Sequence, residues 1–521
     1  MRERVTDTDI PSGRRRGRSR TEGMSGRLPV QRPFAQPRMI YRPTEVVSAD
    51  ALESIHDASL RILAEIGMDF LDPESRDLLA TAGADVESGT NRVRFDPELV
   101  VELIRTCPST FQMHSWNPAH TLTMGGDHIA FGSVGSPPNI VGLDGVRRPG
   151  DRTAFRDLLR LCQSFNVVHF VGGYPVEPID LHHSVRHLEA AFDVLTLTDK
   201  VLHSYSLGRQ RNRDLIEMAR ISRQVDETTL EREPSVFSVI NSSSPLRLDL
   251  PMLQGIIEFS SRNQVIVMTP FTLSGAMAPI TLAGAVAQQN AEALAGMAFT
   301  QVVRPGAPVI YGGFTSNVDM LSGAPAFGTP EYVRTAMLGG QLARRYNVPY
   351  RSSNVCAANA VDAQAAYESV FSLWGAIMGG VNFLMHGAGW MEGGLHASFV
   401  KFVLDADLLA MVAALLDPIV VDEDTLAFDA IAEVGPGGHF FGVGHTQERF
   451  RDAFHRPMIS DWRNYETWEE AGKPEAPGRA ADLARQFLAE YEPPPMDPAV
   501  REELEAFVAR RVAEGGVPTD Y

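Results

Sequence analysis

The sequence predicts an α/β protein: a (β/α)₈ TIM barrel with an N-terminal helical subdomain and a C-terminal extension that wraps the barrel. Eight short β-rich runs recur along the middle of the chain, and eight parallel strands close such a barrel. A helix-length amphipathic segment lies between most of these runs, which indicates a parallel sheet. A doubly wound open sheet is the alternative, but it usually carries a G-x-G-x-x-G fingerprint after an early strand, and this chain has none there.

The eight predicted strands share a composition rich in β-branched and aromatic residues, and each ends in small or polar residues. They are residues 128–136, 167–174, 201–208, 235–244, 264–275, 308–316, 349–355 and 382–389. Because the last residues of parallel strands meet at one end of a barrel, these segments also predict where an active site would lie. We assign residues 121–420 to a catalytic barrel domain.

Two segments precede the barrel. Residues 1–44 contain the basic run Arg14–Arg20 followed by polar sequence rich in Pro and Gly, which predicts a disordered basic tail. A nucleic-acid-binding arm and a twin-arginine export signal are the alternatives, but no apolar stretch follows the basic run. Residues 45–120 predict a helical subdomain, because the pairs Asp72-Pro73 and Asp96-Pro97 are typical helix starts.

Residues 421–521 predict an extension that covers the barrel or meets a second subunit, and we therefore expect a homo-oligomer. The net charge of −18 disfavours nucleic-acid binding, which needs basic surface. Three scattered cysteines do not provide a disulfide framework, which favours a reducing, cytoplasmic location. No stretch approaches the ~20 uncharged apolar residues of a membrane helix, so we expect no membrane partner.

Several common chemistries lack their motifs in this chain. No H-E-x-x-H, G-x-S-x-G or G-x-x-x-x-G-K-[ST] pattern occurs. His183 and His187 are spaced to face one way on a helix, but that helix is predicted to lie outside the barrel. We therefore predict no metal site and no tightly bound metal.

The ends of the predicted strands are rich in aromatic residues and poor in acids. Aromatic faces attract cations, and quaternary ammonium groups are typical ligands of aromatic cages. The predicted substrate-binding residues are Tyr174, Tyr205, Asn241, Phe271, Tyr311, Phe314, Arg351 and Trp390. The predicted catalytic residues are Asn354, His386 and Glu392. The composition of these ends therefore favours a small quaternary amine as the substrate.

Each of these residues also has a simpler alternative role. An aromatic residue at a strand end can cap the core, and Glu392 can bind the amides of its own loop. Arg351 can form a salt bridge between loops; as a site residue it would bind a substrate carboxylate through two parallel hydrogen bonds. His386 would be a polar contact that orients the substrate.

Several long motifs carry a family resemblance. They are "NSSSPLRLD" (241–249), "PITLAGAVAQQNAEALAG" (279–296), "PGAPVIYGG" (305–313), "DAQAAYES" (362–369), "GAGWMEGGLHASFVKFVLD" (387–405) and "EVGPGGHF" (433–440). In this order they resemble the trimethylamine methyltransferase family across residues 45–475. The resemblance implies a barrel enzyme that moves a methyl group from an amine nitrogen to the cobalt of a corrinoid (cobalamin) carried on a separate corrinoid-binding protein.

The founding members of that family hold pyrrolysine near the segment that matches residues 350–362, whereas this chain has none and carries Cys356 in the same region. It is therefore similar to the relatives without pyrrolysine, such as glycine betaine methyltransferases, which act on quaternary amines. A quaternary nitrogen already carries the charge that makes the neutral amine a leaving group, so positioning and desolvation would suffice. The alternatives are a tetrahydrofolate-linked demethylase on the same barrel and a non-catalytic quaternary-amine-binding protein.

Overall fold

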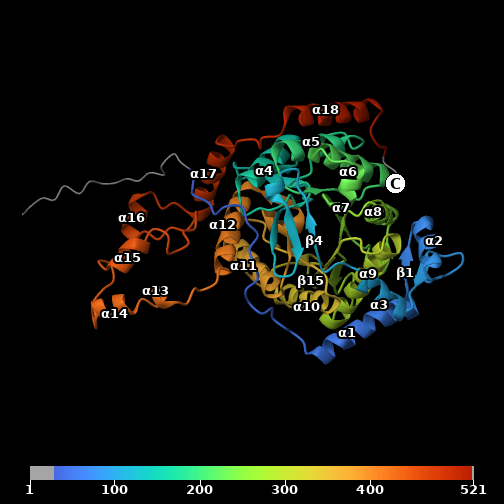
Figure 1. Cartoon of the computed structure of the whole chain (residues 1–521), viewed down its shortest axis with the longest axis horizontal. Coiled ribbons are helices and arrows are strands. Elements are labelled where there is room, and N and C mark those ends of the chain that lie inside the picture. Colours follow the sequence, from blue (N-terminus) through green and yellow to red (C-terminus); the bar gives the residue numbers. More distant parts are fainter. Residues whose placement is uncertain (1–27, 519–521) are drawn as a thin grey trace, which may run out of the picture. The chain divides into compact units, whose positions relative to one another are not determined.

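The computed structural model describes residues 28–518 (Figure 1). The basic run Arg14–Arg20 lies outside the described residues. The sequence assigns residues 31–44 to the tail, but they belong to one compact unit with the described residues that follow them. The Gln31 side-chain amide donates to the Ser164 carbonyl (2.8 Å), and the Met39 amide donates to the Asp127 carbonyl (2.7 Å). Within residues 28–518, no helix is both long enough and apolar enough to cross a bilayer.

The segment before the barrel combines three helices with small sheets. The helices are α1 (Ala49–Arg61), α2 (Pro73–Thr81) and α3 (Pro97–Arg105), and a π-helical turn, η1 (Ile62–Ile66), extends α1. Asp72 and Asp96 cap α2 and α3 through their carboxylates, as the Asp-Pro pairs predict. The strands β1 (Met68–Phe70), β2 (Asp85–Val86) and β3 (Arg92–Arg94) form a sheet with β11 (Arg247–Leu248), which the sequence pattern did not predict.

Seven parallel strands form most of the barrel. In spatial order they are β6 (Ala130–Ser133), β18 (Phe383–Ala388), β17 (Tyr350–Ser353), β14 (Val309–Gly312), β12 (Val265–Met268), β10 (Val236–Ile240) and β9 (Leu202–His203). The remaining predicted strand, residues 167–174, contributes a single bridging residue, Phe170, which pairs in parallel with Gly132 on one side and Val201 on the other. Gly132 permits this approach, because a Cβ there would lie 2.2 Å from the Phe170 ring. The ring of eight closes, and the predicted barrel is confirmed.

One long helix follows each barrel strand, which gives the alternation that the sequence predicted (Figure 1). These helices are α4 (Arg152–Ser164), α5 (Arg186–Leu197), α6 (Arg209–Arg223), α8 (Leu250–Ser261), α9 (Leu282–Val303), α10 (Pro330–Tyr346), α11 (Ala363–Met378) and α12 (Phe399–Leu415). A short helix, α7 (Glu227–Arg232), follows α6. Capping carboxylates begin several of them; the Asp151 side chain, for example, accepts from the Ala154 amide at 2.7 Å.

Additional strands extend the C-terminal side of the barrel. A first sheet contains β13 (Phe271–Ser274), β15 (Phe314–Val318) and β16 (Pro325–Ala326). A second contains β7 (Asn139–Val141), β8 (Arg147–Pro149), β19 (Trp390–Met391) and β20 (His396–Ser398), and the 3₁₀ turn η3 (Glu392–Gly394) joins β19 to β20. These sheets carry Phe271, Phe314 and Trp390 beyond the ends of the barrel strands.

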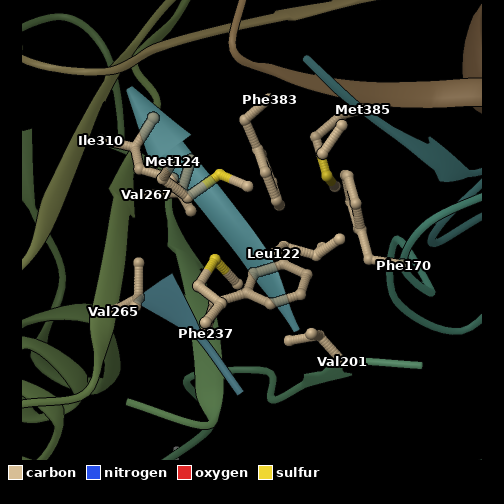
Figure 2. Packing of buried hydrophobic residues seen from close by; sticks show 12 residues of the cluster. Leu122, Met124, Phe170, Val201, Phe237, Val265, Val267, Ile310, Phe383 and Met385 are labelled. Atoms are coloured by element: carbon tan, nitrogen blue, oxygen red, sulfur yellow. The ribbon is translucent and has the colours of Figure 1, made fainter. Parts of the chain in front are cut away.

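A hairpin fills the opposite, N-terminal end of the barrel. It consists of β4 (Thr110–Met113) and β5 (Leu122–Gly125), which are joined through the turn η2 (Pro118–His120). Figure 2 shows Leu122 and Met124 among the inward-facing residues of the barrel strands. The rings of Phe170 and Phe383 stack there with centroids 4.0 Å apart. Apolar side chains of the described residues thus fill this end of the barrel, and active sites of such barrels lie at the C-terminal end.

The chain after the barrel forms six helices within the described residues. They are α13 (Glu423–Leu426), α14 (Phe428–Val434), α15 (Gly444–Arg449), α16 (Tyr465–Glu470), α17 (Ala476–Ala489) and α18 (Pro498–Ala513). Helix α17 packs on α12 and α4, and α18 packs on α5 and α6. Phe487 of α17 contacts Phe165 with ring centroids 4.4 Å apart, and Arg511 of α18 pairs with Asp214 at 2.9 Å. The last two helices thus cover the outer helices of the barrel. The predicted domain boundaries at residues 44, 120 and 420 stay a prediction.

Candidate active site

A cavity of about 250 Å³ lies at the C-terminal ends of the barrel strands. It is small compared with the ~300–1,000 Å³ of pockets for drug-sized ligands, and so suits a small substrate. Seven of the predicted site residues line it: Tyr205, Asn241, Phe271, Phe314, Arg351, His386 and Trp390. Four others do not: Tyr174, Tyr311, Asn354 and Glu392. The structure therefore brings together most of the predicted substrate-binding set.

A larger hollow of about 720 Å³ lies outside the barrel, against α6, α8 and α18. Most of its charged lining residues already have a salt-bridge partner; examples are Arg220 with Glu217 (2.7 Å) and Arg511 with Asp214 (2.9 Å). A groove whose charges are already neutralised offers little to a charged ligand. We therefore place the candidate site in the smaller barrel cavity.

A bulge in β18 turns His386 toward the cavity. The pairing of β18 with β6 shifts register between Leu384 and Ala388, and His386 has a left-handed φ of 55°. Strict alternation would send His386 to the same side as Leu384, away from the inward-facing Met385. Bulges commonly re-aim side chains in this way beside active sites.

Asn354 supports this bulge from behind the cavity wall. Its side-chain amide donates to the Gly387 carbonyl (2.9 Å), and its backbone amide donates to the Met385 carbonyl (3.1 Å). The side chain is buried, and its Oδ1 has no hydrogen-bond partner among the described residues. Asn354 was predicted as a catalytic residue, and its contacts are those of a residue that positions His386.

Aromatic rings form one wall of the cavity. The ring centroids of Phe271 and Phe314 lie 5.3 Å apart, and those of Phe314 and Trp390 lie 6.1 Å apart. The His386 ring lies 5.5 Å from Trp390 at a shallow angle, and Phe327 supports Trp390 edge-on at 5.3 Å. Phe327 was not predicted, because it follows β16, a short strand that the sequence pattern did not reveal. This wall presents π faces that can attract a cation.

Arg351 is the one predicted charged residue that lines the cavity. Its side chain is only 2% exposed, and no salt bridge joins it to a carboxylate of residues 28–518. Its Nη1 donates to the Gly313 carbonyl (3.3 Å), and its Nε has no partner in that part of the chain. Burial lowers the pKa of the guanidinium to about 10. A buried cation without an anion is costly, so the site is suited to bind one.

Two neutral imidazoles also line the cavity. Both ring nitrogens of His203 lack a partner among the described residues, and burial lowers the pKa of His203 to about 3. Burial, followed by the charge of Arg351, holds the pKa of His386 well below its usual range. A neutral imidazole offers one N–H donor and one acceptor without adding positive charge. His203 was not in the predicted set, although it precedes Tyr205 by two residues in the predicted strand 201–208 and their rings lie 4.5 Å apart.

Tyr205 is held firmly at the rim. Its hydroxyl shares a hydrogen bond with Ser136 Oγ (2.6 Å) and accepts from the Tyr174 backbone amide (2.9 Å). The Tyr174 ring packs one layer further out, against Phe155 and Tyr205. Tyr174 therefore supports Tyr205 and does not reach the cavity.

Tyr311 lies outside the barrel wall. Ile310 belongs to the inner core, so its neighbour Tyr311 faces the outer helices, where its hydroxyl donates to Asn290 Oδ1 of α9 (3.0 Å). Ring contacts with Tyr346 and Tyr350 complete its surroundings. Tyr311 therefore does not line the cavity as predicted, because adjacent residues of a strand face opposite sides and Ile310 takes the inward one.

Glu392 ties the last loop together at the edge of the site. Its carboxylate pairs with Arg147 Nε (2.9 Å) and accepts from His396 Nδ1 (2.8 Å). These partners hold the pKa of Glu392 below its ordinary value against the opposing effect of burial. The hydrogen bonds are those of a residue that fastens the loop carrying Trp390, although the partners are two side chains and not the loop amides that the sequence suggested.

Asn241 reaches the cavity from the loop after β10, and a buried carboxylate from α9 shapes that loop. Glu292 accepts from Ser244 Oγ (2.6 Å) and from the Leu246 amide (2.9 Å), and Ser242 also donates to it. The serine-rich motif at 241–249 and Glu292 of α9 thus satisfy each other's hydrogen-bonding groups. Buried polar groups of this kind fix a single loop geometry when all are satisfied.

The described residues contain no group of three or more His, Cys, Asp and Glu side chains placed to hold a metal ion. The sequence placed His183 and His187 on one helix, but α5 begins at Arg186, so His187 lies in its first turn and His183 precedes it. His187 Nε2 is paired with Asp214 Oδ2 at 2.9 Å. The cavity itself therefore relies on Arg351, neutral polar groups and aromatic rings.

Fold and cavity together define a barrel with an aromatic, acid-poor site and a buried arginine. A protein-family model described as Trimethylamine methyltransferase (MTTB) matches residues 13–516, which identifies the chain as a methyltransferase enzyme. More narrowly, it belongs to the trimethylamine methyltransferase family, as the motifs indicated.

Curated relatives match nearly the whole chain. A glycine betaine methyltransferase of Desulfitobacterium hafniense (strain Y51) is 34% identical over 472 residues, which cover 90% of this chain and 98% of the relative. The trimethylamine methyltransferase MttB of D. hafniense (strain DSM 10664 / DCB-2) is 28% identical, over 90% of this chain and 94% of its own. The crystal structure of the hydroxylamine MtmB complex aligns with 87% of this chain at 11% identity and a TM-score of 0.47, too low to carry an argument.

Proposed function

We propose that this methyltransferase takes a methyl group from a small betaine, a quaternary amine that bears a carboxylate, and passes it to the cobalt(I) of a corrinoid on a separate protein. The observation that carries the proposal is the buried guanidinium of Arg351, which has no anionic partner in residues 28–518 and lies beside an aromatic wall. The name of the glycine betaine methyltransferase relative supports it. We place this activity in the cytoplasm.

The two ends of a betaine match the two kinds of surface in the cavity. Its carboxylate would pair with Arg351, and its ammonium would face Phe271, Phe314 and Trp390. Two unit charges 4 Å apart interact by about 4 kcal/mol at an effective dielectric constant of ~20, so an ammonium placed directly beside Arg351 would be strongly repelled. The carboxylate must therefore lie between the two cations, and this requirement fixes the orientation of the substrate.

The reaction needs little acid–base chemistry from the protein. When the C–N bond breaks, its electron pair stays on nitrogen and a neutral tertiary amine leaves, so no proton has to be supplied. A corrinoid brought by its carrier protein would supply the nucleophile that accepts the methyl group. In this account His386 and His203 orient the substrate, Tyr205 and Asn241 complete the polar side, and Asn354 and Glu392 position their neighbours.

A turnover assay tests the proposal. Purified protein is incubated with betaines and reduced cobalamin, and the demethylated product and methylcobalamin are measured by mass spectrometry and absorbance. We expect both products in equal amounts. Binding without either product would favour the non-catalytic amine-binding alternative, and demethylation with tetrahydrofolate alone would favour the folate-linked one.

A further inference from the structure

A stripe of apolar side chains on α11 is uncovered. It consists of Tyr367, Val370, Phe371 and Trp374, which follow the i, i+3, i+4, i+7 spacing of one helix face. Trp374 is 51% exposed, and Glu368, the only charged residue of α11, is buried. A stripe with this spacing normally packs against another element, so α11 lacks a partner on this face within residues 28–518.

A second apolar surface lies on the segment 418–457, here called the arm, which contains α13, α14 and α15 (Figure 1). Its exposed large apolar side chains are Ile419, Val420, Val421, Leu426, Phe428, Ile431, Phe440, Phe441, Phe450 and Phe454. Phe441 and Phe454 are 82% and 86% exposed. Aromatic residues at this density are typical of the core of a protein interface.

Within residues 28–518, the polar contacts that fasten the arm to the rest of the chain lie at its two ends. Before it, Asp417 pairs with Arg32 (2.6 Å); after it, the Asp407 carboxylate accepts from the amides of Met458 (2.8 Å) and Ile459 (3.1 Å). Between these points, the hydrogen bonds and ion pairs of the arm are internal among the described residues, as in the pair of Arg449 with Asp424 (2.8 Å). The arm is thus held in place while most of its large apolar side chains stay exposed.

We propose that the chain forms a two-fold symmetric homodimer in which the arm of each copy covers the α11 stripe of the other. Both uncovered surfaces belong to the same chain. A two-fold axis therefore pairs the arm of each copy with the stripe of the other, and one self-complementary interface covers all four surfaces. The stripe carries no exposed charge, so the net charge of −18 does not oppose contact there. This inference is independent of the proposed reaction.

The oligomeric state of the full chain tests the proposal. Sedimentation velocity over a range of concentrations is expected to show a dimer for the unmodified protein. The double variants Phe371→Asp/Trp374→Asp on α11 and Phe441→Asp/Phe454→Asp on the arm should each raise the dimer dissociation constant about 30-fold or more, the scale for loss of an interface hot spot. The control Leu321→Asp, at a 98% exposed loop residue outside both surfaces, should leave it unchanged.

Crosslinking separates this arrangement from other dimers. Chains carrying Trp374→Cys are mixed with chains carrying Phe441→Cys and treated with a short bis-maleimide, and the unmodified protein serves as the background for Cys107. A crosslink in the mixture that is absent from either variant alone supports the exchange of arms. A protein that is monomeric at all concentrations, a dimer unaffected by both double variants, crosslinking of Trp374→Cys with itself, or association only after another protein is added would overturn the proposal.

Discussion

The guanidinium carbon of Arg351 lies 5.2 Å from the centroid of the Phe314 ring, inside a cavity where no carboxylate of residues 28–518 pairs with it. The two residues come from different sheets: Arg351 belongs to β17 of the barrel and Phe314 to β15 above it. Phe314 thus has a fixed cation near its ring, and it also neighbours the rings of Phe271 and Trp390. An anion is required to complete the charge balance of this pair, and that requirement leads to the predictions below.

Removing the unpaired charge should stabilise the empty protein. We expect Arg351→Met to increase the free energy of unfolding by at least ~1 kcal/mol, because a buried cation without a counter-ion is replaced by an apolar side chain of similar length. Urea unfolding followed by circular dichroism measures this difference. The exposed Arg334 on α10 provides the matched control, Arg334→Met, which should stay within ~0.5 kcal/mol. Destabilisation by Arg351→Met would show that its guanidinium is satisfied in the free protein.

The aromatic wall should account for part of the affinity for the ammonium group. Trp390→Leu is expected to weaken the binding of a quaternary amine by ~1–2 kcal/mol, because the site loses a π face while an apolar side chain remains. Isothermal titration calorimetry measures the loss. Tyr311→Phe is the contrasting variant: it should bind the ligand normally and lose ~1 kcal/mol of stability with its hydrogen bond to Asn290. Equal effects of the two variants on binding would argue against the assignment of the wall.

Ligand binding should vary little between pH ~5 and 8, the range in which ordinary histidines titrate. The pKa of His203 is lowered to about 3 and that of His386 lies well below its usual range, so both rings are neutral throughout. Carboxylate binding needs the protonated form of Arg351, which is lost as the pH rises through about 10. Calorimetric titrations across this range should show constant affinity and then a decline at the alkaline end. A midpoint near 6.5 would indicate a charged histidine in the site.

Variants of Glu392 and His386 should distinguish a residue that fastens the loop from a residue that contacts the substrate. Glu392→Gln keeps the shape of the side chain and weakens a partly exposed ion pair, so it should cost no more than ~1 kcal/mol of stability and change turnover only a few-fold. His386→Ala removes a group that lines the cavity and should lower kcat/KM by at least tenfold. Steady-state demethylation kinetics compare the two. A larger loss of kcat/KM for Glu392→Gln than for His386→Ala would show that the Glu392 carboxylate acts in catalysis.

The barrel could be predicted from the sequence because strands and helices alternate regularly. The seven predicted residues that line the cavity were placed at strand ends or in the loop that follows the last strand. The errors have local causes. Tyr311 was placed on the wrong face, since adjacent residues of a short strand cannot be assigned to a side without a reference contact such as that of Ile310. Tyr174 was predicted to line the site but does not, because its predicted strand is reduced to the single bridging residue Phe170.

Other features depend on backbone geometry that composition does not reveal. The left-handed φ of His386 and the register shift of β18 bring its ring into the cavity, and a histidine gives no local signal for a bulge. Phe327 reaches Trp390 only through the fold of the β15–β16 hairpin. The uncovered faces of α11 and the arm likewise emerge only when the chain is folded, because apolar residues at helical spacing usually indicate a buried face.

The most direct test of the central claim is a calorimetric comparison of two ligands that carry the same trimethylammonium group, one with a carboxylate and one with a neutral ester in its place. The unmodified protein is expected to bind the betaine at least tenfold more tightly, and Arg351→Met should abolish that preference while retaining weak binding of both ligands. Equal affinity of the unmodified protein for the two ligands, or a preference that survives Arg351→Met, would contradict the account.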